Sequence, residues 1–335
     1  MLEQHYLTTL FEPKSVAVIG ASDRENAVGN VIFKNILGSG YKGRLYAINP
    51  KHETVLGQQT YKSIEEIGAR VEMAVIATRP QTVPQIIEQC GRSGVRNVII
   101  IAAGFSESGH IGAALERKVL EMARSYNVRI LGPNCLGIIR PDLGLNATFA
   151  KMSASGGNLA LVSQSGAMCS AVLDWAKSNQ IGFSSVISIG MTADIDFGEI
   201  LDYLIYDNLT HYILLYVEGI RDARRFMSAL RSRLHRLVFV WLLCQVATLT
   251  AFLPAGCCAT HRTEVAGTPE YHGAAEGPCP MRAVTGEECP MHASPAVGTP
   301  GHQAADDCVM RAVCDGPASA LSLLMPIAGV LSELP

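Results

Sequence analysis

The sequence lacks several features that would place it in a familiar class at once. No apolar signal-peptide core occurs within residues 1–30, because Glu3, Gln4 and His5 interrupt the start of the chain. The formal net charge is only −3, which gives no electrostatic case for binding nucleic acid. We therefore expect residues 1–230 to stay in the cytoplasm, with no nucleic-acid partner.

Cysteine and lysine are scarce in opposite parts of the chain. Three of the ten cysteines, Cys90, Cys135 and Cys169, lie before residue 231, and no lysine follows Lys177. Isolated cysteines suit a reducing compartment, whereas a cysteine-dense segment is typical of an exported or metal-binding chain. The composition therefore predicts a junction near residue 231 between two unrelated parts.

Up to about residue 150, short apolar runs alternate with helix-like patterns. The runs cover residues 15–22, 44–50, 73–80, 97–104 and 128–134. Continuous β-branched runs separated by helices are typical of buried parallel strands in a doubly wound sheet. We predict a Rossmann-like α/β domain over 1–150, with its ligand beyond the carboxyl ends of the strands.

A second α/β pattern begins near Gly157. Strand-like runs at 158–164, 183–190 and 211–219 alternate with helix-like runs, and the alternation stops near residue 230. A doubly wound domain usually has more strands. We therefore predict a truncated flavodoxin-like α/β domain over 151–230.

The segment VIGASDRENAVG (18–29) combines a strand, a glycine turn and the start of a helix. Gly20 allows a sharp turn whose N–H groups can face an anion. The spacing is G-x8-G rather than G-x-G-x-x-G, and AINPK has no acidic residue where a ribose ligand would stand, so NAD is not expected. Lys51 is placed to bind phosphate. The alternatives are a purely structural turn and a solvated lysine.

The segment VSQSGA (162–167) repeats this arrangement of strand, polar turn and helix. Ser163, Ser165 and Gly166 would offer hydroxyl and backbone donors to a phosphate at the positive end of the helix. An N-cap role for Ser165 explains the same residues equally well.

Several motifs occur in one order: IGAS, INP, LGPNCLG, LGLNATFA, LVSQSGA, SIGMTADIDFGEILDYL and LLYVEGIRDARRF. Together they resemble the CoA-binding and ligase-like domains of ADP-forming acyl-CoA (acetate–CoA) synthetases. The same module is similar to the front part of bacterial GNAT-type protein-lysine acetyltransferases and, more distantly, to the succinyl-CoA synthetase α subunit. The resemblance covers about residues 5–230.

The resemblance implies a role for each matching position, with coenzyme A or acyl-CoA as the cofactor. Residues of the first turn and the second strand end would hold the CoA phosphates, namely Gly20, Ala21, Ser22 and Lys51. Residues of two later strand ends would line the CoA groove, namely Ile101, Ala102, Ala103 and Asn134. Ser163, Ser165 and Gly166 would face a phosphohistidine, and Glu218 would orient that histidine. A salt bridge within the domain is the alternative for Glu218.

The sequence departs from the family in the parts that use a phosphohistidine. No histidine after Glu218 stands in an S-H-T-G setting, and neither a nucleotide-grasping domain nor a GNAT domain follows. The prediction is a CoA-binding front part of an acetate–CoA ligase, or of a related protein acetyltransferase, that is incomplete and inactive alone. ATP or ADP would enter only if a partner subunit carried the grasp domain.

An uncharged run from Leu237 to Thr260 follows a cluster of basic residues. It is long enough to span a bilayer as a helix, and the basic side would stay in the cytoplasm. This favours a transmembrane helix over 237–255 within a hydrophobic segment at 231–258. A buried strand formed by LVFVWLL and a displaced export signal with LPAGC ending at Cys257 are the alternatives.

The tail, 259–335, has little periodicity and is rich in Cys, Pro, Gly and His. The repeats CPMR, CPMH and CVMR supply candidate soft-metal ligands, namely Cys279, Met281, Cys289, Met291, His292, Cys308 and Met310. Disulfides in an exported tail, or an irregular chain, are the alternatives. A membrane-tethered CoA sensor or soft-metal-handling fusion protein is accordingly the second functional hypothesis.

Overall fold

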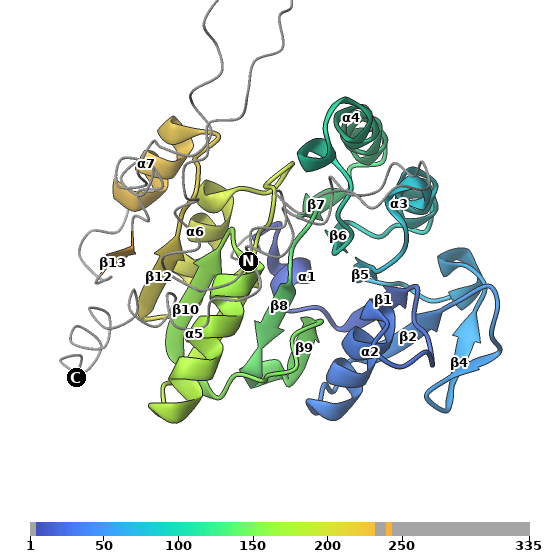
Figure 1. Ribbon diagram of the computed structural model, residues 1–335, viewed down its shortest axis with the longest axis horizontal. Helices are drawn as coiled ribbons and strands as arrows, with labels where there is room; N and C mark the ends of the chain where they lie inside the picture. Colours follow the sequence, from blue (N-terminus) through green and yellow to red (C-terminus); the bar gives the residue numbers. More distant parts are fainter. Residues whose placement is uncertain (1–4, 232–238, 243–335) are drawn as a thin grey trace, which may run out of the picture. The chain divides into compact units, whose positions relative to one another are not determined.

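The computed structural model describes residues 5–231 and 239–242. In this part the chain forms two β-sheets with helices on their faces (Figure 1). The first sheet contains seven strands in the order β3-β4-β2-β1-β5-β6-β7, and the second contains six in the order β13-β12-β10-β11-β8-β9. An α/β fold with two sheets rich in parallel pairs is therefore confirmed.

The first sheet is parallel from β4 to β7. Its strands are β1 (Ser15–Ile19), β2 (Arg44–Ile48), β3 (Thr54–Val55), β4 (Gln58–Tyr61), β5 (Met73–Ile76), β6 (Asn97–Ile100) and β7 (Arg129–Leu131). The chain runs outward from β1 to β2, then returns to β5 on the other side. This reversal leaves the carboxyl ends of β1, β2 and β5 beside one another.

Alternate residues of the central strands enter different apolar clusters on the two faces of the sheet. Val16 and Val18 contribute to one cluster, whereas Ala17 and Ile19 contribute to the other. Helix α2 (Val28–Gly38) covers the first face, and α3 (Val83–Arg92) and α4 (His110–Ser125) cover the second. Every side chain of β1 is buried, which explains why the strand is apolar after its first residue, Ser15.

The second sheet draws strands from both sides of residue 150. Its parallel strands are β10 (Gly156–Ser163), β11 (Phe183–Ser188) and β12 (Tyr212–Tyr216), and β8 (Gly137–Arg140) pairs antiparallel with both β11 and β9 (Leu145–Thr148). Helix α5 (Gly166–Ser178) covers one face, and α6 (Phe197–Tyr206) and α7 (Ala223–Arg231) cover the other. Residues 137–148 thus complete the second sheet.

Strand β13 (Phe239–Leu242) extends the second sheet beside β12. The two strands are parallel, with Ile213 opposite Phe239 and Tyr216 opposite Leu242. The prediction of a transmembrane helix from residue 237 is therefore wrong at residues 239–242, where the structure has the strand that was the alternative. In the ranges that the structure describes, no helix is long and apolar enough to cross a bilayer. Residues 243–335, including the rest of the predicted span and the irregular tail, lie outside the described residues.

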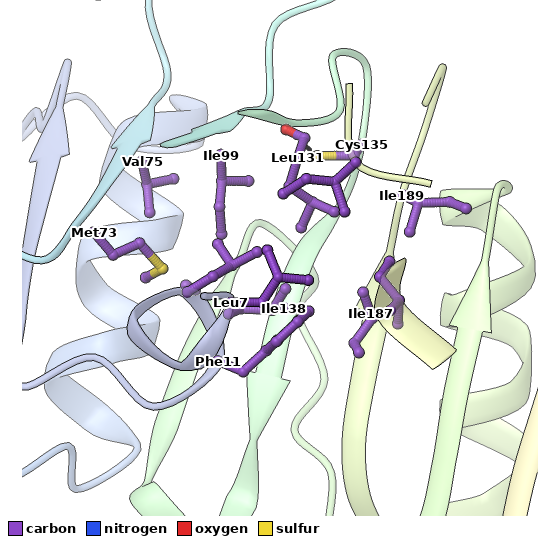
Figure 2. Packing of buried hydrophobic residues seen from close by; sticks show 14 of the residues in the cluster. Leu7, Phe11, Met73, Val75, Ile99, Leu131, Cys135, Ile138, Ile187 and Ile189 are labelled. Carbon is purple, nitrogen blue, oxygen red and sulfur yellow. Dashed lines mark hydrogen bonds between the residues drawn. The ribbon is translucent and has the colours of Figure 1, made fainter. Parts of the chain in front are cut away.

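The short N-terminal helix α1 (Thr8–Phe11) contributes to an apolar cluster that both sheets share. Figure 2 shows Leu7 and Phe11 among side chains of the first sheet, such as Ile99, and of the second sheet, such as Ile187. Leu7, Leu10 and Phe11 are fully buried. The residues before β1 therefore help to hold the two sheets together.

The remaining helical turns are short 3₁₀ segments in the connections. They are η1 (Ile64–Ile67), η2 (Pro80–Thr82), η3 (Ser106–Ser108) and η4 (Pro141–Leu143). Of these, η2 follows the carboxyl end of β5, and η4 joins β8 to β9.

Candidate functional site

The turn after β1 requires glycine at position 20. Gly20 has a φ of +94°, and a Cβ there would lie 2.8 Å from the carbonyl oxygen of Ala77. A side chain would therefore be strained by the backbone conformation and would also collide with the end of β5. The backbone N–H of Gly20 donates to Ile48 O at 3.0 Å, and Ala77 N–H donates to Ile19 O at 2.9 Å, so the turn is tied to the strands on both sides.

The start of helix α2 packs directly on this turn through a second glycine. A Cβ at Gly29 would lie only 1.9 Å from the carbonyl oxygen of Gly20. Ala27 precedes the helix, and no side chain caps its first turn. The N-terminal end of a helix dipole is partly positive and offers N–H donors. The G-x8-G spacing thus brings a helix N-terminus against the β1 turn, which is the arrangement that an anion needs.

Two asparagines hold the residues of the turn from either side. Asn49 Nδ2 donates to Ala21 O at 2.7 Å, and Asn30 Nδ2 donates to Ser22 O at 2.7 Å. Asn49 Oδ1 also accepts from the backbone N–H of Lys51 at 2.8 Å. Sequence reasoning missed both asparagines, although Asn49 stands in the INP motif at a strand end.

Lys51 lies just beyond β2, and its side chain is exposed. It forms no ion pair in the part of the chain that the structure describes. The structure places a second cation, Arg79, just beyond β5 on the other side of β1. A basic residue therefore follows each of the two strands that neighbour β1.

The other predicted CoA-groove residues lie at the carboxyl ends of β6 and β7. Ile101 is buried, Ala102 is half-buried and Ala103 is exposed. Asn134 is exposed, has a φ of +52°, and donates its backbone N–H to Ala102 O at 3.0 Å. The structure thus brings the predicted residues of four strand ends to one edge of the first sheet.

The predicted phosphate turn follows β10 in the second sheet. The hydroxyl of buried Ser163 donates to Ser165 O at 2.8 Å and accepts from Ser165 N–H at 3.0 Å. Ser165 Oγ accepts from Met168 N–H at 3.2 Å and so caps helix α5, which begins at Gly166. The N-cap alternative for Ser165 is therefore correct, and a cap at this place still leaves the other first-turn donors at the positive end of the helix.

Glu218 follows β12 at the same edge as Ser165. The backbone N–H groups of Glu218 and Gly219 donate to Gln164 Oε1 at 2.6 and 2.9 Å. The Glu218 side chain is exposed, and within residues 5–231 it has no ion-pair partner. The structure thus gives no sign of the alternative salt bridge, and Gln164 joins the two turns.

The segment after β11 connects the edges of the two sheets. Met191 N–H donates to Pro133 O at 2.9 Å, and Ile189 N–H donates to Ser163 O at 2.8 Å. Gly190, with a φ of +54°, leaves no room for a side chain, because a Cβ would lie 2.3 Å from Pro133 O. The loop after β7 is therefore bonded to the turn region of the second sheet. The Arg221 guanidinium adds to this junction by donating to the carbonyl oxygens of Thr192 and Ala193.

A partly buried ion-pair network fixes the same junction from the start of β7. Arg129 contacts Asp194 at 2.8 Å and Glu199 at 2.8 Å. Tyr6 donates its hydroxyl to Glu199 at 2.7 Å, and its ring lies 5.4 Å from the Arg129 guanidinium. Burial, together with the hydrogen bond to Glu199, raises the pKa of Tyr6. The network positions the sheets, and sequence reasoning did not identify it.

The described cysteines are unsuited to nucleophilic chemistry. Burial raises the pKa of each of Cys90, Cys135 and Cys169 to about 12, and the thiolate is the reactive form. Within the described ranges no group of three metal-ligating side chains is found. The candidate metal ligands Cys279, Met281, Cys289, Met291, His292, Cys308 and Met310 lie outside those ranges.

Two protein families match the chain in tandem. Residues 14–141 match the "CoA binding domain", and residues 156–242 match the "Succinyl-CoA ligase like flavodoxin domain". The second match extends to the last residue of β13.

Curated relatives are similar over about two thirds of the chain. The acetate–CoA ligase [ADP-forming] I of Archaeoglobus fulgidus is 45% identical over 223 residues, which are 67% of this chain and 32% of that protein. The subunit alpha of acetate–CoA ligase [ADP-forming] I of Pyrococcus furiosus is 44% identical over 230 residues, 68% of this chain and 50% of that protein. The chain thus spans about a third to a half of these relatives.

A solved structure shows the same arrangement of elements. The dinucleotide-forming acetyl-coenzyme A synthetase 1 of Ca. Korarchaeum cryptofilum, in complex with phosphate and ADP, has a TM-score of 0.67 and 35% identity. The alignment covers 70% of this chain and 51% of that one. An ATP citrate lyase from Methanothrix soehngenii, with a TM-score of 0.54 and 17% identity, shares the fold.

Proposed function

Residues 14–242 carry the CoA-binding and succinyl-CoA-ligase-like domains found in ADP-forming acetate–CoA ligases, and on this premise we propose that the chain binds coenzyme A or its thioesters. The CoA pyrophosphate would lie against the β1 turn, with Gly20, Ala21 and Ser22 supplying the backbone. Lys51 would contribute a cation, and Ile101, Ala102, Ala103 and Asn134 would line the rest of the groove.

The observation that carries this proposal is the approach of α2 to the β1 turn. Gly20 and Gly29 together let an uncapped helix N-terminus lie against a turn with left-handed backbone at its first residue. Such a place stabilises a negative group through oriented N–H donors. The INPK segment at the end of β2 has no acidic residue where an NAD-binding site would have one, and Lys51 follows shortly after, so a phosphate-rich ligand fits better than NAD.

The second sheet would handle phosphoryl groups in the complete reaction. We propose that Ser163, Ser165 and Gly166 face the phosphate of a phosphohistidine, and that Glu218 orients the imidazole. In the structure the Ser165 and Glu218 turns are joined through Gln164, which lies beside Ser165 and accepts from Glu218 N–H. This connection would keep the carboxylate and the helix N-terminus in a fixed relation.

The catalytic cycle would need groups beyond residues 14–242, namely a histidine-bearing loop and a nucleotide-grasping domain. We propose that a partner subunit supplies them, since a relative that matches over this region is itself named subunit alpha. ATP or ADP would then bind with the partner, and this chain would contribute the CoA groove and the phosphate-facing helix.

The test is isothermal titration of the full chain with CoA, compared between wild type and Lys51→Met. We expect wild-type binding that weakens about tenfold in the variant, which corresponds to about 1.4 kcal/mol. Lys118→Met, an exposed lysine on α4, is the matched control and should bind as wild type. No heat of binding at millimolar CoA would reject the proposal. Adding a grasp-domain subunit, with acetyl-CoA, ADP and phosphate, then tests separately for ATP formation.

A further inference from the structure

Two adjoining pockets lie away from the carboxyl edge described above. The larger, of about 730 Å³, is lined by Lys14, Lys42 and Arg44 and by residues of η4. The smaller, of about 500 Å³, is lined by Lys34, Lys151 and residues of β9 and α2. Both pockets include Pro141 and Gly144, so they meet at the connection between β8 and β9. We call this pair the basic groove.

The pairing of β1 with β2 explains why three cations gather in the larger pocket. Ser15 lies opposite Arg44 in the parallel register, and Arg44 N–H donates to Lys14 O at 2.9 Å. The residues just before each strand, including Lys42, therefore share the amino edge of the sheet. A five-residue strand such as β1 (Ser15–Ile19) is roughly 16 Å long at about 3.3 Å per residue, so this edge is distinct from the Gly20 turn.

The opposite wall of the groove is held rigidly in place. Asn35 of α2 donates through Nδ2 to Thr148 O and Ala150 O, both at 2.8 Å. Gly144, with a φ of +63°, lies so close to the end of α2 that a Cβ would be 2.7 Å from Gly40 O. These contacts tie α2 to β9 (Figure 1), so the groove is a preformed feature of the fold.

The cations of the groove form no side-chain ion pair among the described residues, and the carboxylate of Glu72 accepts from the backbone N–H of Lys14 at 2.8 Å. Lys14, Lys34, Lys42, Arg44 and Lys151 form no ion pair in that part of the chain. Two carboxylates line the larger pocket, and each already has a hydrogen-bond or ion-pair partner. Glu12 accepts from the Tyr203 hydroxyl at 2.6 Å, and Asp142 pairs with buried Arg140 at 3.1 Å. The lining of the smaller pocket has two lysines and no acidic residue.

We propose that the basic groove binds a small molecule carrying several phosphate charges, at a site separate from the CoA groove. Each pocket has the volume of a small-ligand site. Lysine ammonium groups are compact point charges suited to phosphate oxygens, and clustered cations of one sign raise the local concentration of anions. The inference stands independently of the proposed CoA binding, because it uses residues of the opposite edge.

The test is isothermal titration of the full chain with inorganic tripolyphosphate, with and without saturating CoA. Three double variants each remove two lysines: Lys14→Met with Lys42→Met, Lys34→Met with Lys151→Met, and the control Lys118→Met with Lys177→Met. We expect wild-type binding in both conditions, at least tenfold weaker binding in each groove variant, and a change below about twofold in the control. Circular dichroism and thermal unfolding confirm that each variant is folded.

Several outcomes would overturn the proposal. Absence of tripolyphosphate binding to the wild-type chain would do so, as would equal weakening in all three double variants. Loss of binding in Lys51→Met, with the groove variants unaffected, would place the anion at the β1 turn instead. Failure of CoA to bind would reject the proposed function while leaving this result intact, since the comparison of groove and control variants does not depend on CoA.

Discussion

At the scale of single residues, position 29 leaves no room for a methyl group, whereas position 38 of the same helix does. A Cβ at Gly29 would lie 1.9 Å from Gly20 O, but one at Gly38 would meet nothing within 4 Å. Gly29→Ala should therefore push α2 away from the turn and lower the free energy of unfolding by about 1–3 kcal/mol. Gly38→Ala should leave it unchanged or raise it by up to about 1 kcal/mol.

Urea unfolding of the two variants checks this prediction, and titration with CoA extends it. Because Gly29→Ala displaces the helix N-terminus from the turn, it should also weaken CoA binding, whereas Gly38→Ala should not. Equal stability of the two variants would mean that α2 does not approach the turn as closely as the structure shows.

The buried thiols predict an alkaline limit to stability. Burial raises the pKa of Cys90, Cys135 and Cys169 to about 12, compared with about 8.5 for a free thiol. The folded state therefore keeps protons that the unfolded state loses at high pH. The stability from neutral burial is fully present below about pH 8.5 and should fall as the pH rises toward 12.

Alkylation with iodoacetamide followed by mass spectrometry measures how far burial protects each cysteine thiol from reaction. At about pH 9, just above the pKa of a free thiol, the three residues should stay unmodified in the folded protein and react within minutes in urea. Native modification at the rate of a free cysteine would show that these thiols are accessible.

At the scale of elements, helix α5 allows the cap and phosphate roles of Ser165 to be separated. Its hydroxyl caps the helix through Met168 N–H. Ser165→Ala should cost about 1 kcal/mol of stability, while Ser165→Asp should keep the cap. Ser165→Ala removes the hydroxyl that would bind phosphate, and Ser165→Asp adds a carboxylate that would repel it. Both variants should therefore lose phosphate binding in ³¹P NMR titrations. Full binding by Ser165→Asp would reduce Ser165 to a structural cap.

Strand β13 predicts an alternation between adjacent positions. Neighbouring residues of a strand direct their N–H groups to opposite sides, so only one of Val240 and Trp241 donates toward β12. Of the variants Val240→Pro and Trp241→Pro, one should lose about 1–3 kcal/mol through a lost ladder bond, and the other should be tolerated at the edge. Hydrogen exchange of the β12 amides shows which of the two proline variants disrupts the pairing of β13 with β12. Equal effects of the two prolines would contradict the parallel pairing with β12.

At the scale of the whole molecule, the strands that sequence predicts well are those buried on both faces. The runs ending at Ile19, Ile76 and Ile100 carry only apolar residues or small polar ones, and their alternation with helices indicates a parallel sheet. The turns that follow them come to one edge because parallel strands share a direction. The candidate residues around Gly20 and Asn134 can therefore be grouped from the sequence alone.

Other elements could not be predicted for physical reasons. Strand β9 carries the buried polar residues Asn146 and Thr148, whose side chains are hydrogen-bonded to one another, and the four-residue β8 ends at the buried Arg140, so no long apolar run marks either strand. The Arg129 network joins residues 65 positions apart through contacts that no local pattern encodes. At 239–242, an uncharged run satisfies both a helix and a buried strand, and pairing with β12 decides between them.

The basic groove illustrates the same limit. Its cations come from separate places in the sequence, and only the register of β1 with β2 and the packing of α2 on β9 bring them together. Motifs identify the carboxyl edge because its residues are contiguous in each turn. They do not mark the basic groove, whose single lysines lie before β1 and β2, within α2 and after β9.

A crystal structure of the full chain with CoA would test the proposed binding mode most directly. We expect the pyrophosphate within about 3 Å of backbone N–H groups in the Gly20–Ser22 turn, at the N-terminus of α2. Density for CoA elsewhere, or an empty carboxyl edge at saturating CoA, would contradict this binding mode.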